Sequence, residues 1–354
     1  MSSSKSILAL FLILSGAAAW SEPVPAIFIK GLVEEADLII VAKVERVERV
    51  GLGEATFHEQ TYRRADFRAE LTVDETIKGE PVPTKFVLSY STPGIDSVGN
   101  VAEGGLFANL HHYQVVFLKK TATGYAFASP FTPAVPATKT SCGSNWGRDV
   151  SGDAYQMVLQ RIVGVLCATT DLDEKRRALM MVNREDISAA PALKAAMNLS
   201  DVRADPGLRT GIIATLLTWK DTSVLPLAED ELFLTQVEGT LKSNLLLAIS
   251  SLDPKISVPL LTRALTLPEP EARVGAARFL EYTKSPAAVD VLLTALDDPD
   301  LEVQFAVMQS LGNLTNQYSW RPQTTETNSS WFDCLEHWHE FAERPRRLPH
   351  RSQN

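Results

Sequence analysis

Apolar positions in the first part of the chain alternate with polar ones, a spacing typical of β-strands. Between residues 65 and 74, apolar side chains occupy every second position and charged or hydroxyl side chains lie between them, within a stretch that runs to Ile77. This period of two predicts a strand with one buried and one solvated face. The continuous apolar run at 38–42 predicts a strand inside a buried layer, which Gly51 and Gly53 are expected to end. Three further short strands are predicted at 85–90, 113–118 and 124–128.

Beyond residue 153 the apolar spacing becomes helical, and the sequence repeats itself. A shift of 31 positions places Leu265 on Leu296 and Leu280 on Leu311. Each unit contains an apolar helix, a turn with proline and acidic residues, and a second helix. Such a fixed period is the pattern of an α-solenoid. Shifts of 31 and 64 together predict four helix pairs, at 187–219, 222–252, 256–284 and 286–314.

Both ends of such a solenoid need a cover, because an end unit has no neighbour on one side. Helices at 155–167 and 171–182 are expected to close the N-terminal end and to join it to the strands. At the other end Asn328, Ser329 and Ser330 can cap a further helix. The side chains predicted to share one face of that helix are Trp331, Phe332, Leu335, Trp338 and Phe341.

The strand region resembles the netrin-like, oligonucleotide/oligosaccharide-binding-type barrel of the tissue inhibitors of metalloproteinases. The resemblance rests on residues 35–43, 69–79 and 113–119, covers about 26–130, and implies a small five-stranded barrel. Those inhibitors chelate the zinc of their target enzyme through an N-terminal cysteine. The first cysteine here is Cys142, so that mechanism is not implied. The barrel is instead expected to be an interaction or structural module.

The helical pairs resemble HEAT repeats, particularly the short bacterial type named after the phycobilisome lyases. In that type the second helix opens with acids and an arginine, as Glu271 and Arg273 do, whereas Gln304 replaces the arginine in the last unit. The resemblance implies a groove lined by successive second helices. Exposed positions near Arg209, Lys242, Arg273 and Gln304 are expected to recur along it and to contact a partner protein.

The expected fold class is therefore α+β and multidomain, with a small five-stranded OB-like β-barrel followed by an all-α HEAT-like solenoid. A length of 354 residues also favours two domains over one compact core. The predicted divisions are a signal peptide at 1–19, the barrel at 20–130, a connector at 131–153, the solenoid with its capping helices at 154–342, and a basic disordered tail at 343–354.

The net charge of the chain argues against one class of partner, nucleic acid. The formal net charge is -9 at pH 7, so the chain offers no obvious source of the phosphate neutralisation on which nucleic-acid binding depends. Nucleic acid is therefore not an expected partner.

The first residues have the three parts of a secretory signal. Lys5 supplies the positive charge, residues 7–15 an apolar core too short to span a bilayer, and residues 17–19 a cleavage site made of alanines. Cleavage is expected near Ala19, which predicts a secreted or periplasmic protein without stable membrane insertion. An uncleaved membrane anchor is the alternative.

The residues with chemical potential do not assemble into a catalytic, cofactor-binding or metal-binding pattern. His337 and His339 lie two apart on a predicted helix, unlike zinc ligands at i and i+4. In an oxidising compartment Cys142 can bridge to Cys167 or to Cys334, while Cys167 can equally be a small buried apolar residue. The pair Cys142 and Cys167 is taken as the candidate disulfide.

These observations predict an exported, non-catalytic scaffold or adaptor that binds an unidentified protein through the groove, with the barrel face as a second candidate surface. One alternative is a factor accessory to an enzyme, because relatives of this repeat type assist cofactor attachment as lyases. The other is a protease-inhibitor-like module that lacks the zinc-chelating cysteine. No cofactor is expected.

Overall fold

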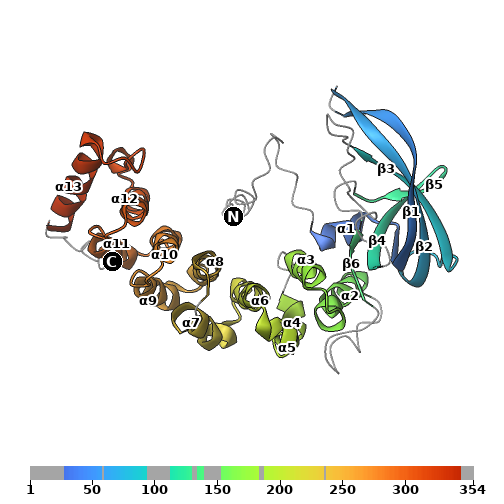
Figure 1. The fold of residues 1–354 in the computed structure, drawn as a ribbon, viewed down its shortest axis with the longest axis horizontal. Helices are drawn as coiled ribbons and strands as arrows, with labels where there is room; N and C mark the ends of the chain where they lie inside the picture. Colours follow the sequence, from blue (N-terminus) through green and yellow to red (C-terminus); the bar gives the residue numbers. More distant parts are fainter. Residues whose placement is uncertain are drawn as a thin grey trace, which may run out of the picture.

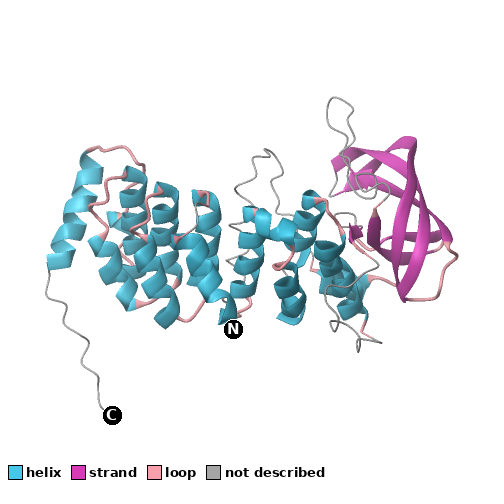
Figure 2. Ribbon diagram, turned by 60° about the horizontal axis from the view of Figure 1, so that its bottom comes forward, coloured by secondary structure: helices cyan, strands magenta, loops and turns pink. Residues whose placement is uncertain are grey.

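The computed structural model describes residues 28–57, 60–93, 112–129, 134–138, 153–182, 187–234 and 237–343. Figure 1 shows an antiparallel sheet followed by an arc of stacked helices. Figure 2 shows the helices stacked along one direction, with the sheet at one end. The predicted signal peptide lies outside the described residues, as does nearly all of the predicted tail.

The sheet contains six described strands in the order β3-β2-β1-β4-β5, and β6 pairs with β4. All of the pairings are antiparallel. Its end strands, β3 and β5, are not joined by a ladder of backbone hydrogen bonds within the described residues, so the predicted closed barrel is not confirmed. The strands are β1 (Leu38–Phe57), β2 (Gln60–Lys78), β3 (Lys85–Pro93), β4 (Tyr113–Thr121), β5 (Gly124–Phe127) and β6 (Ala134–Pro136).

Both faces of the central strands are buried, as the apolar run at 38–42 predicts. Ile39 and Val41 belong to the core shared with the helices, whereas Leu38 and Ile40 belong to a second core on the other face of the sheet. Tyr90 lies in this second core and stacks on Phe67 with ring centroids 5.3 Å apart. Its hydroxyl has no hydrogen-bond partner among the described residues, and burial raises the pKa of Tyr90 to about 12.

Two expectations about strand limits are wrong. β1 does not end at Gly51 but continues through Gly53 to Phe57, with a shift of register between Arg49 and Gly51. Such a bulge admits an extra residue while pairing with the neighbouring strand continues. The predicted connector also contains a strand, because β6 pairs with β4 despite its proline.

The helices form an inner and an outer layer of the arc. α6, α8, α10 and α12 pack side by side, and Figure 1 places α8, α10 and α12 on the inner side and α7, α9 and α11 on the outer side. The helices before the repeats are α1 (Ile29–Glu35), α2 (Ala154–Ala168) and α3 (Leu172–Val182). The others are α4 (Ala190–Ala196), α5 (Ser200–Ala204), α6 (Pro206–Thr218), α7 (Leu225–Phe233), α8 (Gly239–Ser250), α9 (Pro254–Ala264), α10 (Pro270–Tyr282), α11 (Pro286–Thr294), α12 (Leu301–Thr315) and α13 (Ser329–Glu343).

The four predicted helix pairs are present, with the first member of the first pair broken into short pieces. Proline in the first turn starts α9 and α11, where its missing N–H costs no helical hydrogen bond. Three inner helices are followed by a residue in the left-handed conformation, at Lys220, Lys284 and Asn316. A left-handed residue ends a helix, so the repeat spacing seen in the sequence is also a spacing of helix ends.

Close packing of the inner helices depends on small side chains. A Cβ atom at Gly275 in α10 would lie 2.7 Å from Oγ of Ser243 in α8. One at Gly211 in α6 would lie 2.9 Å from Cδ2 of Leu179 in α3. Glycine at these positions therefore lets neighbouring inner helices approach each other closely.

Covers close both ends of the solenoid. Asn328 caps α13 by accepting a hydrogen bond from the N–H of Trp331 at 3.1 Å. Trp331 and Trp338 are 1% and 0% exposed, whereas Phe332 is 58% exposed and points away from the core, contrary to its predicted place on the buried face. At the other end α2 shares the core of the sheet and of the helices, and Arg161 of α2 forms an ion pair with Glu75 of β2 at 2.6 Å.

Within the described chain, none of the helices combines the length and apolar character needed to cross a membrane.

Candidate functional site

The residues predicted to line the groove form a ladder of contacts between successive repeats. Arg273, near the start of α10, donates from Nε and Nη2 to Asp298 at 2.8 and 2.9 Å, and Asp298 lies just before α12. Its Nη1 donates to the carbonyl oxygens of Leu267 and Pro268, both at 3.0 Å. The hydrogen bond to Asp298 is the main cause that raises the pKa of Arg273. This arginine therefore fixes the turn of its own repeat and the entry to the next one.

Lys242 makes the equivalent contact one repeat earlier. Its ammonium donates to Oε1 of Glu269, the residue preceding α10, at 2.9 Å. Burial alone would raise the pKa of Glu269, but hydrogen bonds to its carboxylate, chiefly that from Lys242, hold the pKa below its ordinary value. The charged pair is therefore favoured at neutral pH.

The ladder extends in both directions. Arg209 of α6 pairs with Glu231 of α7, donating from Nη2 at 3.0 Å, and Lys175 of α3 pairs with Asp201 of α5 at 2.5 Å. In the last repeat Gln304 donates from Nε2 to the carbonyl oxygen of Asp298 at 2.8 Å. A neutral amide suffices there, because its acceptor is a backbone carbonyl instead of a carboxylate.

The four residues predicted to contact a partner protein are too buried, or already too engaged within the protein, for that role. Lys242 is only 4% exposed and Arg273 only 9% exposed, and the carboxylates described above already use their donors. Arg209 and Gln304 are half-buried and also engaged. The four positions recur along the repeats as predicted, but Arg209, Lys242 and Arg273 hold neighbouring repeats together and Gln304 holds the turn of its own repeat, so these side chains are not free to recruit a partner.

A different set of side chains lies on the exposed side of the inner helices. On α10 the positions not covered by α8, α9 or α12 are Glu271, Val274, Arg278 and Tyr282, spaced for one helix face. We call these positions, with their equivalents on the two neighbouring helices, the concave stripe. The equivalents are Thr240, Asn244, Leu247 and Ser251 on α8, and Glu302, Phe305, Gln309 and Asn313 on α12.

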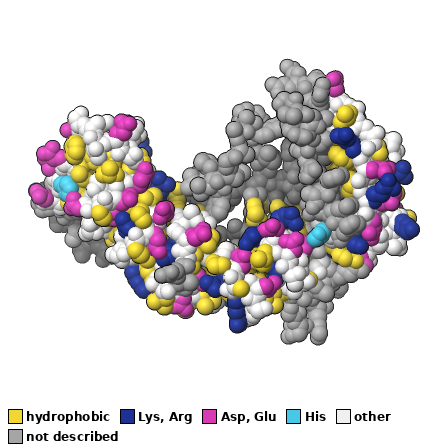
Figure 3. Space-filling model, viewed as in Figure 1, with side chains coloured by type: hydrophobic (Ala, Val, Ile, Leu, Met, Phe, Trp, Pro, Cys, Tyr) yellow, Lys and Arg dark blue, Asp and Glu magenta, His cyan; other side chains and the backbone are white. Residues whose placement is uncertain are grey.

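The concave stripe changes character along the helix axes. Glu271 and Glu302 are exposed near the N-terminal ends of their helices, where carboxylates interact favourably with the helix dipole. Leu247, Val274 and Phe305 are half-buried in the middle. Figure 3 shows the arc hollowed between its two ends, with hydrophobic, acidic and basic side chains close together on the described surface that faces the viewer. The stripe thus offers an apolar centre beside charges of both signs.

Exposed aromatic groups mark the other end of the concave stripe. Tyr282 is 39% exposed at the end of α10, and Tyr318 and Trp320 are 52% and 36% exposed in the segment after α12. Asn313 joins the two segments, because its Nδ2 donates to Glu281 at 2.9 Å and its Oδ1 accepts from Arg321 at 2.7 Å. Sequence reasoning missed these residues, since a lone tyrosine at a helix end carries no periodic signal.

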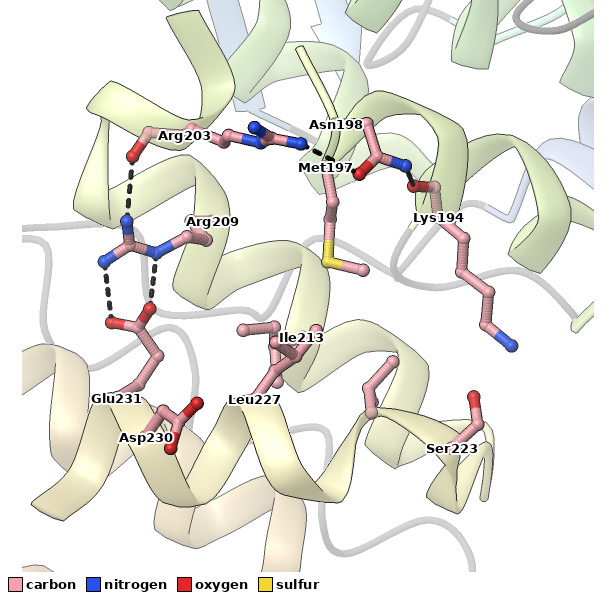
Figure 4. Close-up of a pocket in the computed structure, with 11 residues that line it drawn as sticks. Lys194, Met197, Asn198, Arg203, Arg209, Ile213, Ser223, Leu227, Asp230 and Glu231 are labelled. Atoms are coloured by element: carbon pink, nitrogen blue, oxygen red, sulfur yellow. Dashed lines mark hydrogen bonds and ion pairs between the residues drawn. The ribbon is translucent and has the colours of Figure 1, made fainter. Parts of the chain in front are cut away.

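A cavity of about 730 Å³ lies where the first repeat meets the second, between α4, α5, α6 and α7. Figure 4 shows Arg209 and Glu231 facing each other at one side of it, with Arg203 and Asn198 hydrogen-bonded above. Lys194 at its margin pairs with Asp221 at 2.5 Å. Lys194, Arg209 and Glu231 are thus already paired with other residues of the protein. The surface that the cavity offers to a ligand is therefore mainly apolar.

The cysteines and histidines take separate structural roles. Cys167 is disulfide-bonded, which excludes the simple apolar role, whereas Cys334 is a free buried thiol whose pKa burial raises. Cys142 lies outside the described residues, so its bridge to Cys167 stays a prediction and the bridge to Cys334 is wrong. His337 stacks on Trp320 at 4.0 Å, and His339 pairs with Asp297 at 3.3 Å.

No group of three or more histidine, cysteine or acidic side chains among the described residues is arranged to hold a metal ion.

Comparison with known proteins gives one match. The family model described as HEAT repeats matches residues 257–320, which comprise α9 to α12 and the turn that follows them. None of the curated proteins and none of the solved structures matches the chain. The helical part of the chain is therefore similar to HEAT repeats over its last two pairs, and HEAT repeats suggest a protein-interaction scaffold.

Proposed function

We propose that the chain is an exported, non-catalytic scaffold that holds a partner protein on the concave stripe. The observation that carries this proposal is the equivalence of the stripe on three adjacent helices. α10 and α12 each place a half-buried apolar residue, Val274 or Phe305, at the same level, and α8 places the half-buried Leu247 one turn further along, level with Arg278. A repeated surface of this kind suits an extended segment or a helix of another protein.

The chemistry of the concave stripe defines the partner segment. Its apolar side chains would cover Val274 and Phe305, which lie at the same level, and Leu247, one turn further along. A basic group would lie near Glu271 and Glu302, and an acidic group near Arg278, which makes no ion pair among the described residues. Tyr282 adds a large apolar surface with a polar tip, the kind of side chain that is enriched where interfaces bind most strongly.

Export is supported by two separate observations. The first nineteen residues have the charge, apolar core and small residues of a secretory signal. The disulfide bond at Cys167 fits an oxidising compartment, since such bonds are rare in reducing ones. A scaffold in that compartment would meet other exported proteins.

Site-specific photo-crosslinking in cells that express the full chain tests the proposal. A photoreactive amino acid replaces Arg278 in one variant and Lys255, an exposed residue of the outer helix α9, in the matched control. We expect one discrete protein adduct from position 278 and none from position 255. Equal adducts from both positions, or none from either, would contradict a docking role for the concave stripe.

A further inference from the structure

Among the described residues, one edge of β1 has no partner strand over much of its length. β2 pairs with β1 along all of the strand, but β4 pairs on the other side only from Leu38 to Lys43. The last contact on that side is the N–H of Val44, which donates to the carbonyl oxygen of His112 at 3.2 Å. Between residues 45 and 54 no described strand covers this edge. An unpaired edge offers backbone donors and acceptors to a further strand.

The sequence at this edge is complementary to itself in the antiparallel sense. It reads Val-Glu-Arg-Val-Glu-Arg-Val from residue 44 to residue 50. When two copies are aligned antiparallel about Val47, Arg46 lies opposite Glu48 of the second copy and Glu45 lies opposite Arg49. Opposite charges facing each other across two strands stabilise their pairing.

Neighbouring registers do not have this property. Moving the centre to Arg46 or to Glu48 places like charges directly opposite each other on the symmetry axis. Moving it by half a position brings Glu45 opposite Glu48, or Arg46 opposite Arg49. Like charges directly opposite destabilise a strand pair, so these four registers are disfavoured relative to the one centred on Val47.

The charged side chains at this edge are available for such pairing, whereas Val47 is half-buried against the second core. Arg46 and Glu48 are 64% and 40% exposed at their side chains and pair with each other along the strand at 2.7 Å. Val50 and Leu52 are 58% and 63% exposed, which is unusual for aliphatic side chains beside a sheet. Against β2 the register of β1 shifts between Val44 and Arg46 and again between Arg49 and Gly51, so the regular stretch runs from Arg46 to Arg49 and the strand can bend at either end of it.

We propose that two copies of the chain associate through antiparallel pairing of β1 with β1, centred on Val47 and covering residues 45–49. The two sheets then form one continuous sheet across a two-fold axis, which is the symmetry of most homodimers. The dimer presents two concave stripes and binds a partner with two linked docking segments more tightly than either stripe alone.

A cysteine on the symmetry axis provides the geometric test. The variant Val47→Cys places two thiols on directly opposite residues, whose Cβ atoms are about 4.5–5.5 Å apart in an antiparallel pair. With oxidised glutathione we expect a covalent dimer on a non-reducing gel. The matched variant Val50→Cys places its thiols about 20 Å apart, six residues along the strand, and should stay monomeric on that gel. A dimer from both variants, or from neither, would overturn the proposal.

Charge reversal tests the register in the full chain. In the variant Glu48→Arg, the new arginine lies opposite Arg46 of the second copy, and symmetry repeats this like-charge pair once more in the dimer. The dissociation constant of the dimer should therefore rise by at least about tenfold. The exchange Arg46→Glu/Glu48→Arg restores both pairs and should restore the dimer. Glu80→Arg, in the exposed turn between β2 and β3, makes the same change of charge elsewhere and should leave it intact.

Sedimentation equilibrium over a range of protein concentrations measures the dissociation constant, and circular dichroism verifies that each variant folds. A wild-type chain that stays monomeric overturns the proposal, as does a dimer that ignores the reversal at Glu48. Failure of the dimer proposal would leave the docking proposal untouched, because none of the residues at the β1 edge belongs to the concave stripe.

Discussion

Arg273 in α10 donates two parallel hydrogen bonds, of 2.8 and 2.9 Å, to the carboxylate of Asp298, which lies in the turn before α12. The two side chains are 10% and 9% exposed, so water does little to screen them. A charged donor with this fixed fork matches a carboxylate in both position and direction. The contact therefore sets how one repeat is rotated relative to the next, and with it the alignment of the concave stripe.

Removing the arginine should destabilise the solenoid strongly. Arg273→Gln leaves the carboxylate of Asp298 buried without its charged partner, which costs about 3–5 kcal/mol in comparable pairs. The double variant with Asp298→Asn should lose less than the two single losses added together, because the residues are coupled. Urea unfolding measures the free energy of unfolding. As a control, Arg278→Gln should change it by no more than about 0.5 kcal/mol.

Adding one methyl group at Gly275 should also destabilise the chain. The new Cβ atom would lie 2.7 Å from Oγ of Ser243, so α8 and α10 would be forced apart. Overpacking of this kind costs about 1–3 kcal/mol and outweighs the helix propensity gained from alanine, about 1 kcal/mol. Gly31→Ala in α1, where no heavy atom lies within 4 Å, should raise the melting temperature instead. Effects of equal sign at both positions would contradict the close-packing argument.

The aromatic cover of the last repeat depends on Trp338. This side chain is fully buried, and its Nε1 donates to the carbonyl oxygen of Trp320 at 2.9 Å. Trp338→Ala should cost about 3–5 kcal/mol and raise amide hydrogen exchange in α12 and α13. Phe332→Ala, on the exposed side of α13, should leave the exchange of both helices unchanged.

Acid should weaken the repeat ladder. The hydrogen bond from Lys175 lowers the pKa of Asp201 below its ordinary value of 3.8. The folded chain therefore holds this proton less tightly than the unfolded chain. The stability gained from Asp201 is present above the ordinary pKa and is lost as the pH falls through the lower folded value. Between about pH 6 and about pH 3 the melting temperature should fall less for Asp201→Asn than for the wild type, whereas Asp333→Asn should behave like the wild type.

The sequence was sufficient to predict the helical repeats, because their apolar spacing and their period are local properties. It also identified Arg209, Lys242, Arg273 and Gln304 as equivalent positions. It did not predict their burial, since the carboxylates that pair with Lys242 and Arg273 come from the next repeat. Charged residues at regular spacing normally indicate a solvated face, and only the spatial relation of Arg273 to Asp298 corrects that interpretation.

For the strands, the sequence pattern predicted which faces are buried but not where the strands end or how the sheet closes. Alternation of side chains predicted the buried faces of β1 and β2, but not that β1 continues through Gly51 and Gly53. Glycine weakens a strand without ending it when a partner strand supplies the hydrogen bonds, as β2 does here. Closure of the sheet depends on how its end strands meet, which no local pattern specifies.

The affinity of the partner captured by photo-crosslinking tests the central claim most directly. It would be measured for the wild type, for Arg278→Glu combined with Tyr282→Ala, and for Lys255→Glu on the outer side of the arc. We expect the double variant to raise the dissociation constant at least about a hundredfold, because it removes an aromatic contact and reverses a charge at the centre of the interface. Lys255→Glu should leave the dissociation constant unchanged. An unchanged affinity in the double variant, with its fold intact, would contradict the proposal that the concave stripe is the docking surface.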